Sequence, residues 1–456
     1  MIAVVGSEIT IENYTPEVER FFRERLTFGN PEYAKKLNSG RWVGNTPREI
    51  RLYQRQGRNL IVPFGMLPEI FKRKGWFESI VSGFNAATMN DYKSGIVPYE
   101  YQENAIQAAL KARQGIVVAP CGAGKTQIGL EIAARLGGRT LWLTHTHELL
   151  KQSMERAQSV FGLSGSDYGT ITAGKVDIGN VITFATVQTM NKIDLQSVQN
   201  CWDVIITDEA HHIAGSPTKL MMFWKVISGL KARYKFGLTA TPKRSDGLTP
   251  CMFALIGPMV YEIMRSDVQE TTCPVDVEIH QTEYVPDLND ILMPDGTLNY
   301  AKMITEITMD ANRNAKIVSD ALEAPGKTLI LTDRVEHIKD LEKLIQSCGG
   351  RSEGIYANAK GRKAAIQRLS DGETDILIAT FALAREGLDV PSLQNVIFAT
   401  PQKNETIITQ AAGRVARKSP GKESGKVIDY EDAFGMLRGW QKKRISIYKK
   451  LGFTLH

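Results

Sequence analysis

Residues 115–136 read GIVVAPCGAGKTQIGLEIAARL, and this stretch decides the fold. A short apolar run comes first, then a loop that contains Gly122 and Gly124, and then a pattern typical of a helix. A strand, a glycine-rich loop and a helix in this order form a phosphate-binding loop in parallel α/β sheets. The stretch therefore predicts an α/β fold with a nucleotide at the carboxyl end of a parallel strand.

Each residue of the loop has a chemical role in this prediction. Gly122, Ala123 and Gly124 leave room for backbone N–H groups to turn toward phosphate oxygens. The helix that follows directs its positive end at the same anion. Lys125 is expected to reach the β- and γ-phosphates of ATP, and Thr126 is expected to bind Mg²⁺ through its hydroxyl.

Two further segments fit a nucleotide site. The apolar run in WDVIITDEAHH ends at Asp208 and Glu209, so both carboxylates should lie at the sheet edge that carries the loop. We expect Asp208 to bind Mg²⁺ and Glu209 to activate the attacking water as a general base. Gln102 could pair with adenine, with Tyr99 or Tyr101 stacked on the ring, or it could be an exposed glutamine at a helix start.

Short apolar runs alternate with helical patterns in two stretches of the chain, residues 96–260 and 311–435. Each alternation predicts a parallel sheet covered by helices. Residues 1–95 mix aromatic and basic residues with turn signals, and we expect a small α+β domain there. Residues 261–310 are expected to form a connector with a strand or two, and residues 436–456 a C-terminal helix.

The composition is that of a globular protein: 43% of the 456 residues are hydrophobic, 23% are charged, and the formal charge is +6. No apolar run reaches the roughly 20 residues of a membrane span, and the first residues lack the pattern of a signal peptide. We therefore expect a cytoplasmic protein. The five scattered cysteines and His145, His147 and His212 lack metal-ligand spacing, so neither a disulfide framework nor a zinc site is predicted.

Two candidate catalytic arginines lie in the second stretch. The segment QAAGRVAR carries Arg414 and Arg417, which would share one face of a helix. An arginine supplied by a second domain stabilises charge on the transferring phosphoryl group and makes hydrolysis depend on domain closure. The alternative is a basic helix that faces nucleic acid.

These segments resemble, in their order, the motifs of superfamily-2 helicases. The matching segments are APCGAGKT (119–126), WLTHTHELLKQ (142–152), FATVQTM (184–190), DEAH (208–211), LTATP (238–242), TLILTDRVEH (328–337), ILIATFALAREGLDVPSL (376–393) and QAAGRVAR (410–417). The resemblance covers about residues 99–430. It implies two tandem RecA-like lobes of the DEAH-box type that move along a nucleic acid.

The resemblance also implies roles for single positions. Thr146, Thr186 and Thr380 would contact the backbone of the nucleic acid. Gly387 and Asp389 would sense the nucleotide across the cleft between the lobes, and the two arginines of QAAGRVAR would complete the ATP site from the second lobe.

Other segments narrow the resemblance to DNA-directed members. ATPKRSDGL and ALIGPMVYEI are similar to the xeroderma group B type and to phage helicases that migrate branched recombination intermediates. The N-terminal segments NPEYAKKLNSGRW (30–42) and NTPREIRLYQRQGRNLIVPFGML (45–67) resemble the small DNA-engaging domain of that phage group. There, Arg48, Arg51 and Arg55 belong to a basic cluster, and Trp42, Tyr53 and Phe64 could stack on exposed bases. The alternative is a solvated basic face over an ordinary aromatic core.

The sequence thus predicts an ATP-dependent DNA helicase or translocase that uses Mg²⁺ and remodels forks or Holliday-type junctions in replication, recombination or repair. The expected partner is branched, duplex or single-stranded DNA, with RNA less favoured and no membrane. The protein is expected to be a monomer, in the host cytoplasm if a phage encodes it. Two alternatives stay open: an RNA-dependent ATPase or RNA helicase, and an ATP-gated nucleic-acid clamp with little turnover.

Overall fold

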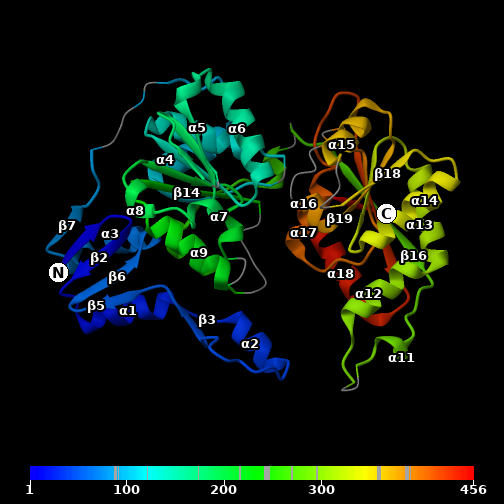
Figure 1. Cartoon of the computed structure of the whole chain (residues 1–456), viewed down its shortest axis with the longest axis horizontal. Coiled ribbons are helices and arrows are strands. Elements are labelled where there is room, and N and C mark those ends of the chain that lie inside the picture. The colour runs from blue at the N-terminus through cyan, green and yellow to red at the C-terminus, as the bar shows by residue number, and fades with distance from the viewer. Residues whose placement is uncertain are drawn as a thin grey trace. The chain divides into compact units, whose positions relative to one another are not determined.

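The computed structural model describes residues 1–86, 90, 92–120, 122–172, 174–214, 217–240, 247–268, 271–293, 296–356, 361–385, 390 and 392–456. The internal contacts divide the chain into two units, Met1–Met264 and Arg265–His456. Each unit contains a parallel sheet with helices on both faces (Figure 1), which confirms the predicted α/β class. Within the described residues, no helix has the length and apolar character needed to cross a bilayer.

The first unit begins with a five-stranded sheet in the order β5–β6–β2–β1–β7, called here the N-terminal sheet. Its strands are β1 (Ile2–Val5), β2 (Glu8–Glu12), β5 (Gln54–Gln56), β6 (Asn59–Pro63) and β7 (Ser79–Ser82), and its helices are α1 (Pro16–Leu26) and α3 (Leu67–Lys72). Every second side chain of β1 and β2 is buried, because successive side chains of a strand point to opposite faces.

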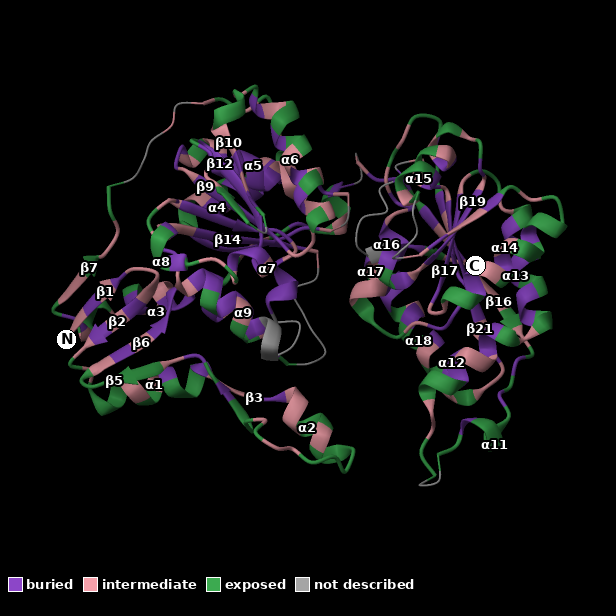
Figure 2. Cartoon of the chain, viewed as in Figure 1, coloured by how far each residue is buried: buried purple, intermediate pink, exposed green. Residues whose placement is uncertain are grey.

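A two-stranded ribbon extends from the N-terminal sheet. It consists of β3 (Thr27–Gly29) and β4 (Glu49–Arg51), and it carries α2 (Pro31–Asn38). We call residues 27–51 the arm. No residue of α2 is buried, and Figure 2 shows the arm as mainly exposed and intermediate residues.

A parallel sheet follows in the same unit, in the order β11–β10–β12–β9–β13–β14–β8–β15. Its strands are β8 (Gln114–Val118), β9 (Thr140–Thr144), β10 (Tyr168–Thr172), β11 (Lys175–Asp177), β12 (Ile182–Thr186), β13 (Val204–Thr207), β14 (Tyr234–Thr239) and β15 (Met259–Glu262). Its helices are α4 (Glu100–Ala112), α5 (Lys125–Leu136), α6 (His147–Phe161), α7 (Val187–Met190), α8 (Leu195–Val198), α9 (Pro217–Ser228) and α10 (Thr249–Ile256). Among these pairs β11 alone is antiparallel, so the loops after the other strands meet at one edge.

The second unit has a seven-stranded parallel sheet in the order β18–β19–β17–β20–β21–β16–β22. Its strands are β16 (Val275–Thr282), β17 (Thr328–Thr332), β18 (Ser352–Ile355), β19 (Ile376–Thr380), β20 (Asn395–Phe398), β21 (Gly425–Asp432) and β22 (Thr454–Leu455). Its helices are α11 (Leu288–Ile291), α12 (Tyr300–Met309), α13 (Ala311–Glu323), α14 (Val335–Ser347), α15 (Arg362–Asp371), α16 (Phe381–Arg385), α17 (Glu405–Gly413) and α18 (Gly435–Lys450). A buried ion pair of 2.7 Å between Arg444 and Asp429 fastens α18 to β21.

Partly buried polar contacts join the N-terminal sheet to the parallel sheet of the first unit. The Nζ of Lys235 on β14 donates to the carbonyls of Ser7 and Ile227, each at 2.9 Å. The indole of Trp224 donates to the carboxylate of Glu8 at 2.9 Å. One apolar core also runs through both sheets. The N-terminal sheet and the first parallel sheet therefore form a single packed body.

The structure differs from the sequence expectations at two places. Phe64 is only 1% exposed, and Lys235 Nζ lies 4.6 Å from its ring centre. The ring is part of the core, so the prediction that Phe64 stacks on bases is wrong. Part of the expected connector is β16, which pairs along its whole length with β21 and belongs to the second sheet. Burial of Val275 and Val277 in that sheet accounts for the pairing. The division into five segments otherwise stays a prediction.

Candidate ATP and nucleic-acid site

The phosphate-binding loop lies between β8 and α5, as the sequence predicts. Gly122 and Gly124 have φ values of 90° and 75°, in the left-handed region that favours glycine. A Cβ at Gly124 would also lie 2.4 Å from the amide nitrogen of Gln102. Both the backbone conformation and the available space therefore require glycine at position 124. Lys125 and Thr126 follow in the first turn of α5.

The side chain of Gln102 supports this loop from α4. Its Nε2 donates to the carbonyl of Ala123 at 2.9 Å, and its Oε1 accepts from the backbone N–H of Tyr99 at 3.1 Å. Gln102 is only 2% exposed, so the reading as an exposed helix-start residue is wrong. The rings of Tyr99 and Tyr101 stack on each other, with centroids 5.7 Å apart.

The two carboxylates that follow β13 lie beside the loop. Lys125 Nζ is 3.5 Å from Glu209 Oε1, and the backbone N–H of Glu209 donates to Asp208 Oδ1 at 2.9 Å. His211 Nδ1 is 3.2 Å from Glu209 Oε2 and 3.1 Å from the hydroxyl of Thr239. The backbone of Glu209 is left-handed, with φ 49°, and such strain in a non-glycine residue is typical of functional sites.

The pKa values of the two carboxylates shift in opposite directions. Burial, and then the negative charge of Glu209, raise the pKa of Asp208 to about 7. Burial would also raise the pKa of Glu209, but Lys125 and then His211 hold that pKa below its usual range. The oxygen donors of Thr126 and Asp208 suit Mg²⁺, which takes one or two protein oxygens together with phosphate and water. The site therefore fits a magnesium nucleotide.

A stack of histidine rings extends away from Glu209. The ring centroids of His211 and His212 are 4.3 Å apart, and those of His212 and His145 are 4.4 Å apart. Gln188 donates to the carbonyl of His145 at 2.9 Å. The stack thus reaches from the carboxylates to the segments that follow β9 and β12. Sequence reasoning missed it, because the positions lie in segments far apart along the chain and no spacing rule connects them.

Three threonines were expected to contact nucleic acid, and each caps a helix that follows a parallel strand. The hydroxyl of Thr146 accepts from Leu149 N at 3.3 Å, and that of Thr186 accepts from Thr189 N at 3.2 Å. The hydroxyl of Thr380 likewise accepts from a backbone N–H, at 3.3 Å. Thr186 is only 1% exposed. Each hydroxyl therefore accepts a hydrogen bond within the protein, and a hydroxyl that accepts one bond can still donate another.

The candidate residues of the second unit are arranged differently from the expectation. Helix α17 ends at Gly413, so Arg414 lies at its C-terminus. Arg417 pairs instead with Thr272 in an isolated antiparallel bridge. The prediction that both arginines share one helical face is therefore wrong, because the chain leaves the helix between them. Gly387 and Asp389 lie outside the described residues.

The arm carries the expected basic cluster, but its members differ in their surroundings. Arg51 pairs with Glu49 at 3.1 Å, and Arg55, just beyond the arm, pairs with Glu19. Arg48 is exposed and forms no ion pair with any described residue. Trp42 is 88% exposed, as a base-stacking residue would need to be. It lines a cavity of about 780 Å³ on the arm.

Comparisons with known proteins agree with this arrangement. Residues 95–244 match the family of the type III restriction enzyme res subunit, and residues 313–419 match the helicase conserved C-terminal domain. The chain is 27% identical over 343 residues to the probable helicase D10 of Escherichia phage T5, covering 73% of this chain and 71% of that protein. It is 34% identical over 173 residues to the DNA 3'-5' translocase XPB2 of Sulfurisphaera tokodaii, covering 38% of this chain and 36% of that protein.

The fold also matches a solved helicase structure. S. cerevisiae Dbp5 bound to RNA and ADP BeF3 aligns with a TM-score of 0.56 at 15% identity, covering 87% of this chain and 94% of that chain. At this identity the likeness concerns the fold alone, which is two tandem RecA-like lobes. The chain belongs to the superfamily-2 helicases, and it is an ATP-hydrolysing nucleic-acid helicase.

Proposed function

We propose that this helicase acts on DNA and remodels branched DNA such as forks and four-way junctions. The observation that carries the proposal is the arm, which belongs to the same packed body as the phosphate-binding loop. Exposed cations such as Arg48 can contact phosphates of any sequence. The exposed Trp42 ring offers a surface on which an unpaired base can stack. A fork presents both features, since duplex backbone and unpaired bases adjoin there, and a four-way junction presents the same combination when bases at the crossover open.

In this proposal the residues around the phosphate-binding loop carry out ATP hydrolysis. Lys125 binds the β- and γ-phosphates, and Thr126 and Asp208 hold Mg²⁺, which neutralises charge on the phosphates. Glu209 accepts the proton of the attacking water. The contact with Lys125 lowers the pKa of Glu209 in the structure, and in this proposal Lys125 turns to the phosphates, which restores the basicity of the carboxylate.

The remaining residues of the proposal respond to the nucleotide or to the DNA. We assign to Arg414 and Arg417 the stabilisation of charge on the transferring phosphoryl group, and to Gly387 and Asp389 the sensing of the nucleotide. The helices capped by Thr146, Thr186 and Thr380 present backbone N–H groups at their N-termini, and such groups suit phosphate oxygens. We assign the grip on the DNA backbone at these motifs to the hydroxyls of Thr146, Thr186 and Thr380 together with these main-chain groups, since a hydroxyl that accepts one hydrogen bond can still donate another.

Steady-state ATP hydrolysis with a panel of nucleic acids tests the proposal. The panel contains single-stranded DNA, duplex DNA, a fork, a four-way junction and RNA at equal nucleotide concentration. We expect the fork or the junction to stimulate hydrolysis most, and Trp42→Ala to reduce that preference. Equal stimulation by all DNA forms would contradict a role in branched DNA.

Two other functions compete with this proposal. An RNA helicase would share the fold, as the likeness to Dbp5 illustrates, and strongest stimulation by RNA would establish it. An ATP-gated clamp would hydrolyse ATP no faster with nucleic acid than without. The presence of Lys125, Asp208, Glu209, Arg414 and Arg417 together argues against a clamp, because a protein without turnover has no chemical need for all five.

A further inference from the structure

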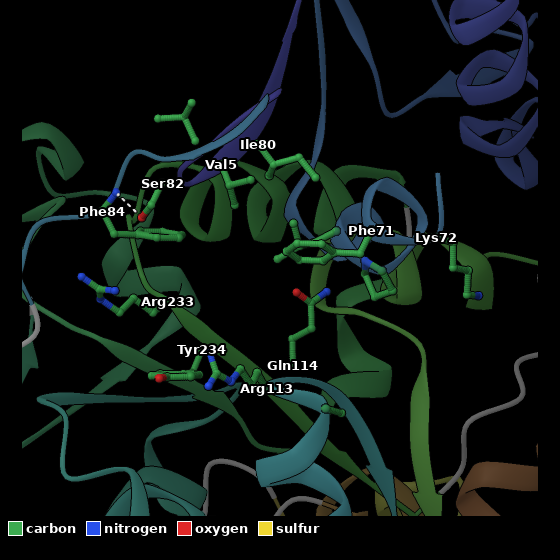
Figure 3. A pocket seen from close by; sticks show the side chains of 14 residues that line it. Val5, Phe71, Lys72, Ile80, Ser82, Phe84, Arg113, Gln114, Arg233 and Tyr234 are labelled. Atoms are coloured by element: carbon green, nitrogen blue, oxygen red, sulfur yellow. Dashed lines mark hydrogen bonds between the residues drawn. The ribbon is translucent and has the colours of Figure 1, made fainter. Parts of the chain in front are cut away.

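A second cavity, of about 700 Å³, lies where the N-terminal sheet meets the first parallel sheet. Figure 3 shows it between Ile80 and Phe71 from the N-terminal part and Gln114 and Tyr234 from the parallel sheet. It shares no lining residue with the candidate ATP site or with the arm. The proposed function therefore gives it no role.

The walls of this cavity are largely apolar. The rings of Phe71 and Phe84 point into it from opposite sides in Figure 3. Phe71 is 56% exposed and Val81 is 45% exposed, which is unusual for side chains of this size. Apolar side chains from a partner could be buried against these rings.

The charged side chains that line the cavity are all basic. Of the fourteen lining residues, Lys72, Arg113 and Arg233 are cationic, and none is acidic. Arg113 forms no ion pair within the described part of the chain. Lys72 shares the carboxylate of Glu69 with Arg73, at 2.9 and 2.5 Å, so one negative charge serves two cations there. The cavity therefore favours an anionic occupant.

An open strand edge borders the same cavity. β7 is the last strand of the N-terminal sheet and pairs on one side with β1. Ile80, Val81 and Ser82 of β7 all line the cavity. Among the described residues no strand pairs with the other edge of β7, so its backbone groups on that side can accept an added strand.

We propose that this cavity binds an acidic peptide segment of a partner protein, extended along the open edge of β7. The backbone of the peptide pairs with β7, and its apolar side chains lie against Phe71 and Phe84. Its carboxylates contact Arg113 first, because Arg233 already lies 4.0 Å from the carboxylate of Asp203. The site thus recruits a partner and is separate from the motor. A nucleic acid is a poorer occupant, because the walls are mostly apolar and a strand edge offers nothing specific to phosphates.

Fluorescence anisotropy with the full chain and a labelled peptide of four Asp-Ile repeats tests the proposal. We expect saturable binding, and Arg113→Asn should weaken it about tenfold, as loss of one charge-assisted contact does. Asparagine tolerates the left-handed backbone of position 113, where φ is 63°, so the fold is retained. Lys111→Asn, on the same helix but outside the cavity, is the matched control and should change nothing.

Two further probes define the outcomes. A peptide of Lys-Ile repeats should fail to bind, and methylation of alternate peptide nitrogens should abolish binding by removing strand pairing. Equal binding of the acidic and basic peptides, or no binding of either, overturns the proposal. Binding of a thymidine oligonucleotide that is lost in Arg113→Asn would also overturn the proposal, because the cavity would then bind nucleic acid. Self-association of the chain that the peptide does not reverse would overturn it as well. DNA-stimulated ATP hydrolysis stays unchanged in Arg113→Asn, so this test is independent of the proposed function.

Discussion

At the scale of single residues, Lys125 is the position whose loss should separate hydrolysis from DNA binding. Lys125→Ala removes the charge that faces the phosphates, while the arm is untouched. We expect DNA-stimulated hydrolysis to fall at least a hundredfold and DNA affinity to stay within about twofold. Hydrolysis assays and DNA binding by anisotropy measure the two, with the exposed Lys111→Ala as control. A parallel loss of both would show that the two sites are not distinct.

The histidine stack leads to a second prediction. His212 lies between His211, which contacts Glu209, and His145, which Gln188 holds. His212→Ala should break this connection and reduce stimulation by DNA about tenfold, with basal hydrolysis and the KM for ATP nearly unchanged. His147→Ala, at the start of α6, is the control. A fall in basal hydrolysis equal to the fall in stimulated hydrolysis would show that His212 supports the carboxylates alone.

The phosphate-binding loop and the carboxylates could be predicted because their spacing and their strand–loop–helix context are local in the sequence. Lys125 and Glu209 lie 3.5 Å apart, as that context implies. The engagement of Gln102 with Ala123 could not be predicted, because it depends on how α4 packs beside the loop. The end of α17 before Arg414 was missed for a similar reason: Arg417 is drawn away by its backbone pairing with Thr272.

At the scale of elements, the arm should bind DNA through cations such as Arg48, which forms no ion pair with any described residue. Each phosphate contact contributes about 0.9 to the slope of log affinity against log salt concentration. Arg48→Ala should lower this slope by about that amount. Arg55→Ala should lower it less, because Glu19 already pairs with Arg55.

DNA affinity measured at several salt concentrations distinguishes the two variants. Both replace an arginine by alanine, but only Arg55 forms an ion pair within the protein, with Glu19. An unchanged slope in Arg48→Ala would place the arm away from the DNA. A larger effect of Arg55→Ala would mean that the ion pair with Glu19 opens when DNA binds.

The strands also show which elements a sequence reveals. The central strands β8, β9, β12, β13 and β14 are buried at nearly every position, and their continuous apolar runs predicted them. β10, β11 and β15 lie at or near the sheet edges and mix polar with apolar residues, so no run marked them. The strands of the N-terminal sheet are short and alternate, and they were anticipated only as part of an α+β domain.

At the scale of the whole molecule, the buried Lys235 should make the stability of the first unit depend on pH. Burial lowers its pKa to about 7, whereas an unfolded lysine keeps the ordinary value of 10.5. Between these values the unfolded chain holds a proton that the folded chain has lost. The free energy of unfolding should therefore rise with pH across this window, by up to about 1.4 kcal/mol per pH unit, and stay level below pH 7.

Lys235→Met removes this group, so the variant should lack the rise that the natural chain shows between pH 7.5 and 9. Urea unfolding followed by tryptophan fluorescence at several pH values measures the difference, with Lys231→Met as control. Parallel pH profiles for the natural chain and Lys235→Met would mean that the ammonium keeps its proton in the folded state.

The partly buried hydrogen bonds of Lys235 and Trp224 also have a mechanical consequence. A sheet held by such bonds cannot swing on a hinge while the protein turns over ATP. DNA bound to the arm must therefore move together with the ATP-binding lobe, as one rigid body, in each cycle of ATP hydrolysis. A disulfide engineered between the N-terminal sheet and that lobe should then leave the speed along DNA unaltered, because the joint it locks does not bend.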